Sequence, residues 1–257
     1  MQLRSDLNVP YVINSNKIEY IDSPTNGVQR RMLDRIGDEV ARATTIVKFA
    51  PNKSFPHHKH GGGEEFLILD GVFSDEISGD HSKYTYCRHG IDTEHHPWTK
   101  DGCVLLVKLR QMNDRDEKDI TFIDGQNATS WRVDEEIQGR SRLDLFSSEK
   151  TGETVWMEKW EPKTQFKWTV GEGGEELFIL EGDMNFSSQE QKENSNNNTI
   201  HSDENTPNLD VNNNCCIANY WIRRPISWKG REFNVWTENG CRIFVKTGHL
   251  AMKLDIH

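Results

Sequence analysis

A short stretch of the sequence, SFPHHKHGGGEEFLILDG at residues 54–71, combines residue types that bind metal ions. His58 and His60 are two positions apart, so on an extended backbone their side chains lie on the same face. The glycines at 61–63 allow a tight reversal that returns Glu64 to the side of the histidines. Two imidazoles and a carboxylate suit a divalent ion such as zinc, iron, manganese or nickel. We therefore expect a metal site here.

A further ligand is needed, and the adjacent histidines His95 and His96 are both available, about one hairpin beyond Glu64. A lone pair of loop histidines is more often solvated than bound to metal. Here, however, histidines gather around this stretch, at positions that include 57, 58, 60, 81, 95 and 96. The clustering favours a metal site. Glu65 should face away from Glu64, because neighbouring side chains on a strand point to opposite faces.

The elements that would position these residues are strands. Runs of strand length alternate with turn residues, as in ARATTIVKFA at 41–50 and CVLLVKLRQM at 103–112. Helical periodicity is not convincing anywhere in the chain. This pattern predicts an all-β fold.

The second half of the chain repeats the first. Three pairs of segments carry the repeat: GGEE at 62–65 and 173–176, APNKSF at 50–55 and EPKTQF at 161–166, and DGCVLLVK at 101–108 and NGCRIFVK at 239–246. The last pair is farther apart than the other two, so the second copy has gained residues. The polar, Asn-rich segment 187–214 accounts for the gain, and we expect it to be a disordered loop. A duplicated unit explains the pattern.

The histidine stretch also resembles a known family. Its HxH pair, with Glu64 after three residues and Gly71 after six more, matches the first motif of the cupins. Residues 27–76 look like the ChrR-like cupin family in particular, and YTYCRHG at 84–90, followed by His95, is similar to its second motif. The resemblance implies two tandem cupin domains (double-stranded β-helix, or jelly-roll, barrels), that is, a bicupin. The implied metal ligands are His58, His60, Glu64 and His95.

We expect the chain to be divided into four parts, with the metal in the first barrel. These are an N-terminal arm at 1–26, cupin domain 1 at 27–115, a linker at 116–139, and a degenerate cupin domain 2 at 140–250. Paired cupin barrels often exchange their N-terminal strands, and the arm is long enough for this.

The second copy lacks the expected ligands. It has no histidine between 161 and 176, and Phe233 is at the position equivalent to His95. Only Glu175 remains, as the counterpart of Glu64. Six of the eight tryptophans lie between residues 156 and 236, in the second domain, where they could fill a barrel. We expect a structural second barrel.

The cupins that this chain resembles include dioxygenases that cleave small diketones or hydroxylated aryl ketones. A mononuclear non-haem metal-dependent oxidoreductase acting on a small-molecule substrate is therefore the preferred hypothesis, with Fe²⁺ as its metal. No catalytic residue beyond the ligands is predicted. The alternative is a non-enzymatic Zn²⁺-binding cupin with a sensor role; Mn²⁺ and Ni²⁺ also remain open. Anti-sigma activity is not expected, because residues 1–50 lack the histidines and cysteines of the zinc-binding domain that it requires.

Composition limits the partners. The formal net charge of −10, without a long basic run, argues against nucleic acid and against an anionic membrane surface. No apolar run is long enough to span a membrane, and no secretory signal is evident. Five cysteines without a CxxC pair favour a reduced, cytoplasmic setting. Whether the protein forms a homodimer is left open.

Overall fold

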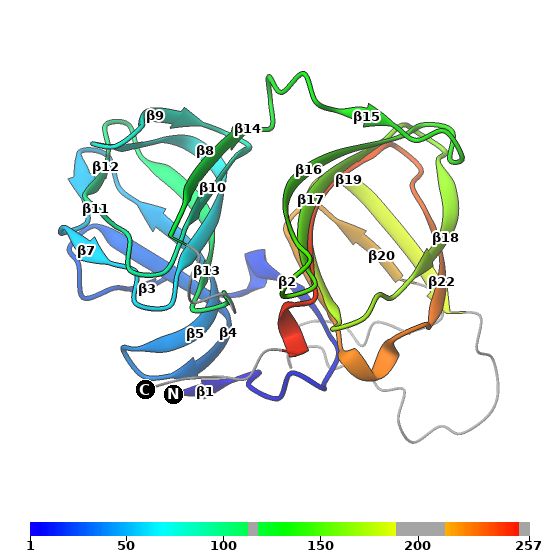
Figure 1. Ribbon diagram of the computed structural model, residues 1–257, viewed down its shortest axis with the longest axis horizontal. Helices are drawn as coiled ribbons and strands as arrows, with labels where there is room; N and C mark the ends of the chain where they lie inside the picture. Colours follow the sequence, from blue (N-terminus) through cyan, green and yellow to red (C-terminus); the bar gives the residue numbers. More distant parts are fainter. Residues whose placement is uncertain (113–117, 189–213, 252–257) are drawn as a thin grey trace. The chain divides into compact units, whose positions relative to one another are not determined.

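Strand pairing accounts for nearly all of the regular structure. The computed structural model describes residues 1–112, 118–188 and 214–251, which divide into two units (Figure 1). In unit 1 the described residues are 1–5, 18–112 and 118–128, and in unit 2 they are 6–17, 129–188 and 214–251. Among the described residues, no helix has the length and apolar character needed to cross a membrane.

Unit 1 is a barrel of antiparallel strands. Its strands are β1 (Gln2–Leu3), β3 (Ile21–Asp22), β4 (Val28–Gly37), β5 (Ala41–Phe49), β6 (Lys53–Ser54), β7 (His58–Lys59), β8 (Glu64–Asp75), β9 (Gly79–Ser82), β10 (Thr85–His89), β11 (Glu94–His95), β12 (Pro97–Thr99), β13 (Cys103–Leu109) and β14 (Ile120–Asp124). The main sheet has the order β1-β4-β5-β13-β8-β10-β14. The apolar face of this sheet, with Phe66, Ile68 and Leu105 fully buried, forms the core.

The long strand β8 pairs with strands of two different sheets. Its first half pairs with β13 and β10, and its second half pairs with β9 and β12. The change occurs at Gly71, which has a positive φ of 75° and would place a Cβ atom 2.1 Å from the Gly102 carbonyl oxygen. Only glycine fits such a close approach of two strands.

Unit 2 repeats this architecture. Its strands are β2 (Tyr11–Asn14), β15 (Arg132–Val133), β16 (Arg140–Ser148), β17 (Glu153–Trp160), β18 (Gln165–Thr169), β19 (Glu175–Ser188), β20 (Asn214–Ile217), β21 (Tyr220–Arg224), β22 (Glu232–Trp236) and β23 (Cys241–Thr247), and its 3₁₀ helices are η1 (Ser15–Lys17), η2 (Ile226–Trp228) and η3 (His249–Ala251). The sheet order is β15-β16-β17-β23-β19-β21-β2. Strand β19 changes sheets as β8 does, at Gly182. The all-β prediction of two cupin-type barrels is confirmed.

The structure divides the chain differently from the expected boundaries. The N-terminal arm contributes β2 to unit 2, where it pairs with β21. The stretch 116–139, expected to be a linker, includes β14 and β15 among its described residues. The expected disordered insertion 187–214 lies outside the described residues except at its ends, which belong to β19 and β20.

Candidate metal centre

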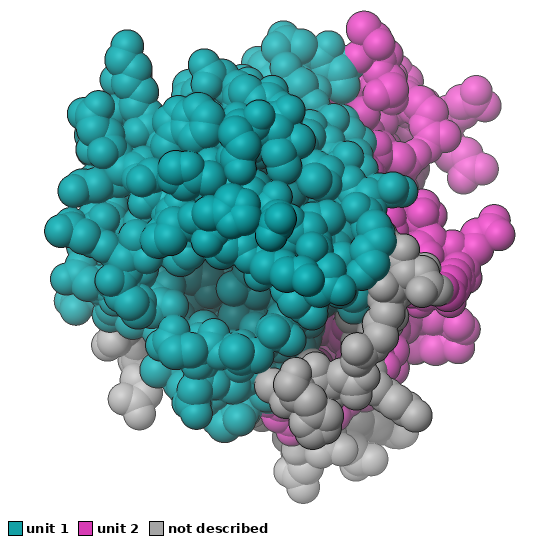
Figure 2. Space-filling view, turned by 60° about the vertical axis from the view of Figure 1, so that its left-hand side comes forward, with its two compact units in different colours: residues 1–5, 18–128, 253–257 teal, residues 6–17, 129–252 magenta. Residues whose placement is uncertain are grey.

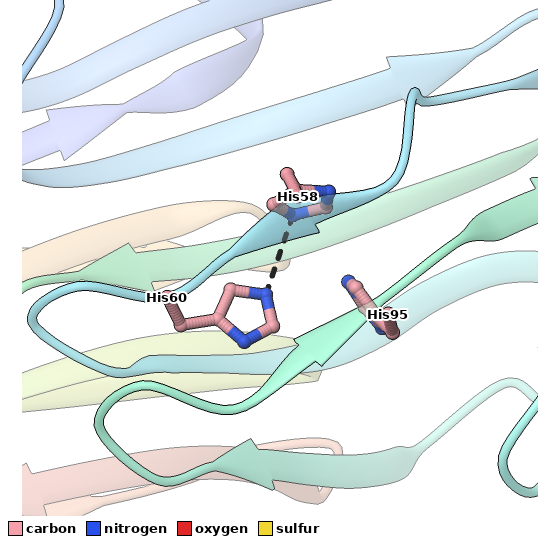
Figure 3. A group of neighbouring side chains, drawn as sticks. All are labelled: His58, His60 and His95. Carbon is pink, nitrogen blue, oxygen red and sulfur yellow. Dashed lines mark hydrogen bonds between the residues drawn. The ribbon is translucent and has the colours of Figure 1, made fainter.

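Three of the four predicted ligands come together inside the first barrel. Strands β7 and β11 pair with His58 opposite His95, and His60 follows directly after β7. The ring centroids are 4.8 Å apart for His58 and His95, 4.9 Å for His58 and His60, and 4.7 Å for His60 and His95. One ligand atom from each ring lies within 4.8 Å of the other two. Figure 3 shows the three rings around a common space, with a ring nitrogen of His95 turned toward the other two.

Hydrogen bonds to the first two rings determine which nitrogen carries the proton. His58 Nδ1 lies 2.9 Å from the Pro56 carbonyl oxygen, so this nitrogen is the donor. The Thr93 hydroxyl donates to the Gly90 carbonyl and therefore accepts from His60 Nδ1 at 3.1 Å. In these tautomers both Nε2 atoms hold lone pairs and lie 3.3 Å apart; in the other tautomer of His60 its Nε2 donates a hydrogen bond to His58 Nε2, the dashed line in Figure 3. Two ring nitrogens bound to one ion at about 2.1 Å are about 3.0–3.4 Å apart, so the pair fits a shared cation.

The structure brings His95, and not His96, to this cluster. The His95 side chain is 1% exposed, and neither ring nitrogen has a hydrogen-bond partner within the described parts of the chain. His95 Nδ1 lies 3.6 Å from Asp75 Oδ2. His96 is exposed, and its backbone N–H donates to the Glu76 carboxylate at 2.8 Å. The alternation of side chains along the strand explains why only one of the two can point inward.

Glu64, the fourth predicted ligand, lies at the edge of the cluster. Its Oε2 atom is 3.7 Å from His60 Nε2, but it lies outside the group whose ligand atoms are all within 4.8 Å of one another. Glu65 faces the other way, where it accepts hydrogen bonds from the Tyr86 hydroxyl at 2.8 Å and from Arg88 Nη1 at 2.7 Å. The two adjacent carboxylates therefore have separate roles.

Burial keeps the imidazoles neutral. It lowers the pKa of His60 to about 2, with a further contribution from the neighbouring rings, and it also lowers the pKa of His58. Burial raises the pKa of Glu64, and His95 partly offsets this effect. Neutral rings offer their lone pairs without first releasing a proton, which is the state that a metal ion requires.

One further histidine, His89, joins the cluster although sequence analysis did not identify it. It is fully buried at the end of β10, opposite Glu64 in the strand register. Its ring centroid is 5.0 Å from that of His60 and 4.5 Å from that of His95. Side chains two positions apart on a strand point to the same face. Cys87 lies in the core, so His89, two positions later, is expected to point inward as well.

A cavity of about 250 Å³ adjoins the cluster. His58, Glu64 and His95 line it, together with Arg30. The rest of its wall is mostly apolar and includes Val28, Val47, Phe49, Leu105, Val107 and Leu109. The surface of unit 1 is hollowed on the side shown in Figure 2. The volume is sufficient for a small organic molecule next to the histidines.

The same positions of the second barrel hold aromatic side chains. Strands β18 and β22 pair with Trp168 opposite Phe233, as β7 and β11 pair with His58 opposite His95. Trp168 and Phe233 are both buried in the core of unit 2. The rings fill the space that the histidines surround in unit 1.

The remaining carboxylate of the second barrel is paired with an arginine. Glu175 and Arg224 are opposite each other on β19 and β21, as Glu64 and His89 are on β8 and β10. Arg224 Nη1 donates to Glu175 Oε1 at 2.9 Å, and Trp168 Nε1 donates to Oε2 at 3.1 Å. Both charged side chains are 1–2% exposed. A protein cation therefore satisfies this carboxylate.

Comparison with known proteins supports the assignment of the first barrel. Residues 8–113 match the family model described as the ChrR Cupin-like domain, which confirms the predicted family for that part of the chain. No curated protein matches the sequence significantly.

Solved structures match nearly the whole chain at low sequence identity. A candidate dioxygenase from Nostoc punctiforme has a TM-score of 0.70 and 12% identity, with 97% of this chain and 86% of that chain covered. The Cupin 2 conserved barrel domain protein of Leptotrichia buccalis has a TM-score of 0.56 and 10% identity, with 93% and 96% covered. The bacterial pirin YhhW of Escherichia coli, in complex with nickel(II), has a TM-score of 0.61 and 8% identity, with 93% and 98% covered. These likenesses establish the cupin-type fold.

Proposed function

We propose that the first barrel binds one divalent metal ion through His58, His60, His95 and Glu64, and oxidises a small ketone or diketone in the adjoining cavity. One observation carries this proposal: His58 Nε2 and His60 Nε2 lie 3.3 Å apart, the spacing of two ligands of one ion, beside a buried third imidazole. The donor set of imidazoles and one carboxylate suits iron, manganese, nickel or zinc.

An ion held there would supply a Lewis acid and, if it is iron, a redox couple for reaction with oxygen. The protein's own groups orient the substrate. The apolar wall formed by Val47, Leu105 and Val107 would exclude water from the reacting carbonyl groups. Thr93 holds the His60 ring in one orientation.

Arg30 indicates the charge of the substrate. It borders the cavity and, in the part of the chain that the structure describes, its Nε atom is buried without a hydrogen-bond partner. A guanidinium can bind an anion such as the enolate of a β-diketone, although the carboxylates of Glu39 and Glu64 line the same cavity. The proposal is therefore a dioxygenase-type cleavage of a small enolisable ketone.

The test is oxygen consumption by the purified protein after loading with Fe²⁺, with acetylacetone as substrate. We expect oxygen uptake that falls at least tenfold in His58→Ala, while the matched variant His96→Ala, which changes an exposed histidine, retains the wild-type rate. Tightly bound zinc without oxygen uptake under any metal would instead support the zinc-binding sensor. The nickel-bound pirin is a reason to include Ni²⁺ among the ions tested.

A further inference from the structure

A second group of buried polar atoms shares His95 with the group formed by His58, His60 and His95. Among the residues that the structure describes, Asp75 Oδ2 and both ring nitrogens of His89 and His95 are buried without a hydrogen-bond partner. These three residues are each no more than 1% exposed. Orphaned polar atoms in a barrel interior are unfavourable, so several of them converging on one point require an explanation.

Asp75 is built to present a single free oxygen. Its Oδ1 atom accepts hydrogen bonds from the Ile77 and Ser78 backbone N–H groups at 2.9 and 2.8 Å, and from the Ser78 hydroxyl at 2.8 Å. Oδ2 then faces His95 Nδ1 at 3.6 Å, beyond the usual length of a hydrogen bond. This separation is close to that of two atoms bound to the same ion.

His89 completes the group. Phe66 stacks on its ring with centroids 5.9 Å apart, and Phe122 contacts it edge-on at 5.5 Å. One ligand atom each from Asp75, His89 and His95 lies within 4.8 Å of the other two. The group therefore has the composition and spacing of a metal site with two imidazoles and one carboxylate.

The two groups share His95, which can serve only one of them at a time. Its Nδ1 atom faces Asp75, while Figure 3 shows a ring nitrogen turned toward His58 and His60. A neutral imidazole has one protonated nitrogen and one lone pair. The tautomer of His95 therefore decides which group is complete.

Access from the cavity differs between the two groups. His58 and His95 line the cavity, but Asp75 and His89 do not. A substrate in the cavity can reach an ion held by the outer group. Two of the three ligands of an ion in the inner group, Asp75 and His89, do not line the cavity, so such an ion would be less accessible to the substrate.

We propose that Asp75, His89 and His95 form an inner metal position that excludes the outer one, so that a single ion has a more accessible and a less accessible location. This inference extends the proposed function through the shared residue His95, but the inner position does not depend on any oxidation. The inner position suits zinc or another divalent ion that accepts mixed imidazole and carboxylate ligands.

The test is metal binding by a chain that lacks the outer group. His58→Ala/His60→Ala should retain about one equivalent of Co²⁺ per chain after gel filtration, with a visible d–d spectrum that differs from that of the wild type. Adding His89→Gln should weaken Co²⁺ binding at least tenfold. Adding His96→Ala instead, as the matched control, should leave it unchanged.

Loss of all Co²⁺ from a folded His58→Ala/His60→Ala protein would overturn the inference. It would leave the proposed function intact if the wild type still binds metal and consumes oxygen. If the double variant does not fold, anomalous diffraction from crystals of the Co²⁺-loaded wild type replaces it. Density beside Asp75 Oδ2 and His89 supports the inner position, and density only among His58, His60 and His95 contradicts it.

Discussion

At the scale of single residues, the candidate site depends on which nitrogen of each imidazole holds the proton. The Pro56 carbonyl and the Thr93 hydroxyl set this for His58 and His60. The backbone carbonyl and the hydroxyl that contact the rings fix their orientation, which brings the two Nε2 atoms close together. This arrangement is testable without knowledge of the substrate.

Thr93→Val should weaken metal binding about tenfold, because it removes the hydrogen-bond acceptor for His60 Nδ1 while keeping the side-chain volume. Thr93→Ser retains the hydroxyl and should bind almost as well as the wild type. Competition with a chromophoric chelator measures both. Equal affinities for the valine and serine variants would show that the hydroxyl has no part in orienting the ring.

The metal-free protein should lose stability as the pH falls below about 6.5. The pKa of His60 is lowered to about 2 in the folded state, from an ordinary value of 6.5, so the unfolded chain binds the proton first. Stability from this group is complete above pH 6.5 and decreases by about 1.4 kcal/mol per pH unit between pH 6.5 and 2. Urea unfolding between pH 7.5 and 5.0 measures the slope. His60→Gln should have a shallower slope than His96→Ala; identical slopes would contradict the buried neutral imidazole.

The residues of the site were only partly predictable from the sequence. The spacing of His58, His60 and Glu64 was sufficient to predict that they lie on one face. Side chains on a strand alternate with a period of two, and the glycine turn returns Glu64 to the side of the histidines. Spacing could not separate His95 from His96, since that choice depends on the register of β11 against β7. His89 was missed because it ends a strand whose interior face becomes clear only once Cys87 is known to be in the core.

At the scale of elements, the position of the site depends on the long strand β8 changing sheets. Glu64 begins this strand and Asp75 ends it, so one element contributes to both metal positions. The turn at Gly71 sets the angle between its halves, and the equivalent Gly182 does the same for β19. The repeated GGEE and the apolar run after it were enough to predict these strands. The change of sheet was not predictable, because it requires the contact with β9 and β12.

Gly71→Ala should destabilise the protein by about 3 kcal/mol, because φ is positive and the new Cβ would overlap the Gly102 carbonyl oxygen. Gly79→Ala is the matched control. Its φ is also positive, but no atom lies within 4 Å of the position that the new methyl group would take, so a loss of about 1 kcal/mol is expected. Chemical denaturation compares the two. Similar losses for both variants would rule out strand crowding at Gly71.

At the scale of the whole molecule, duplication has produced two barrels with different interiors. In the first, among the described residues, the buried rings of His89 and His95 have no hydrogen-bond partner for either nitrogen. In the second, Arg224 neutralises Glu175, and the aromatic rings of Trp168 and Phe233 pack around this pair. The sequence predicted the loss of ligands in the second copy. It did not predict the arginine, which is far from Glu175 in sequence and reaches it only through the pairing of β19 with β21.

Arg224→Met should destabilise the protein by about 3–5 kcal/mol, since it leaves the Glu175 charge buried without a partner. The double variant Glu175→Gln/Arg224→Met should recover much of this loss. Metal binding per folded chain should be unchanged in both variants, because no ligand of the first barrel is altered. Thermal unfolding and metal analysis test the two parts separately, and loss of metal from a folded Arg224→Met chain would place a ligand in the second barrel.

The central claim is that buried histidines of the first barrel bind a divalent ion, with His95 common to both proposed positions. The most direct measurement is the number of Co²⁺ equivalents retained per chain by the wild type, His95→Ala and His96→Ala after gel filtration. We predict about one equivalent for the wild type and for His96→Ala, and almost none for a folded His95→Ala protein. Full retention of Co²⁺ by His95→Ala, or its absence from the wild type, would contradict the account.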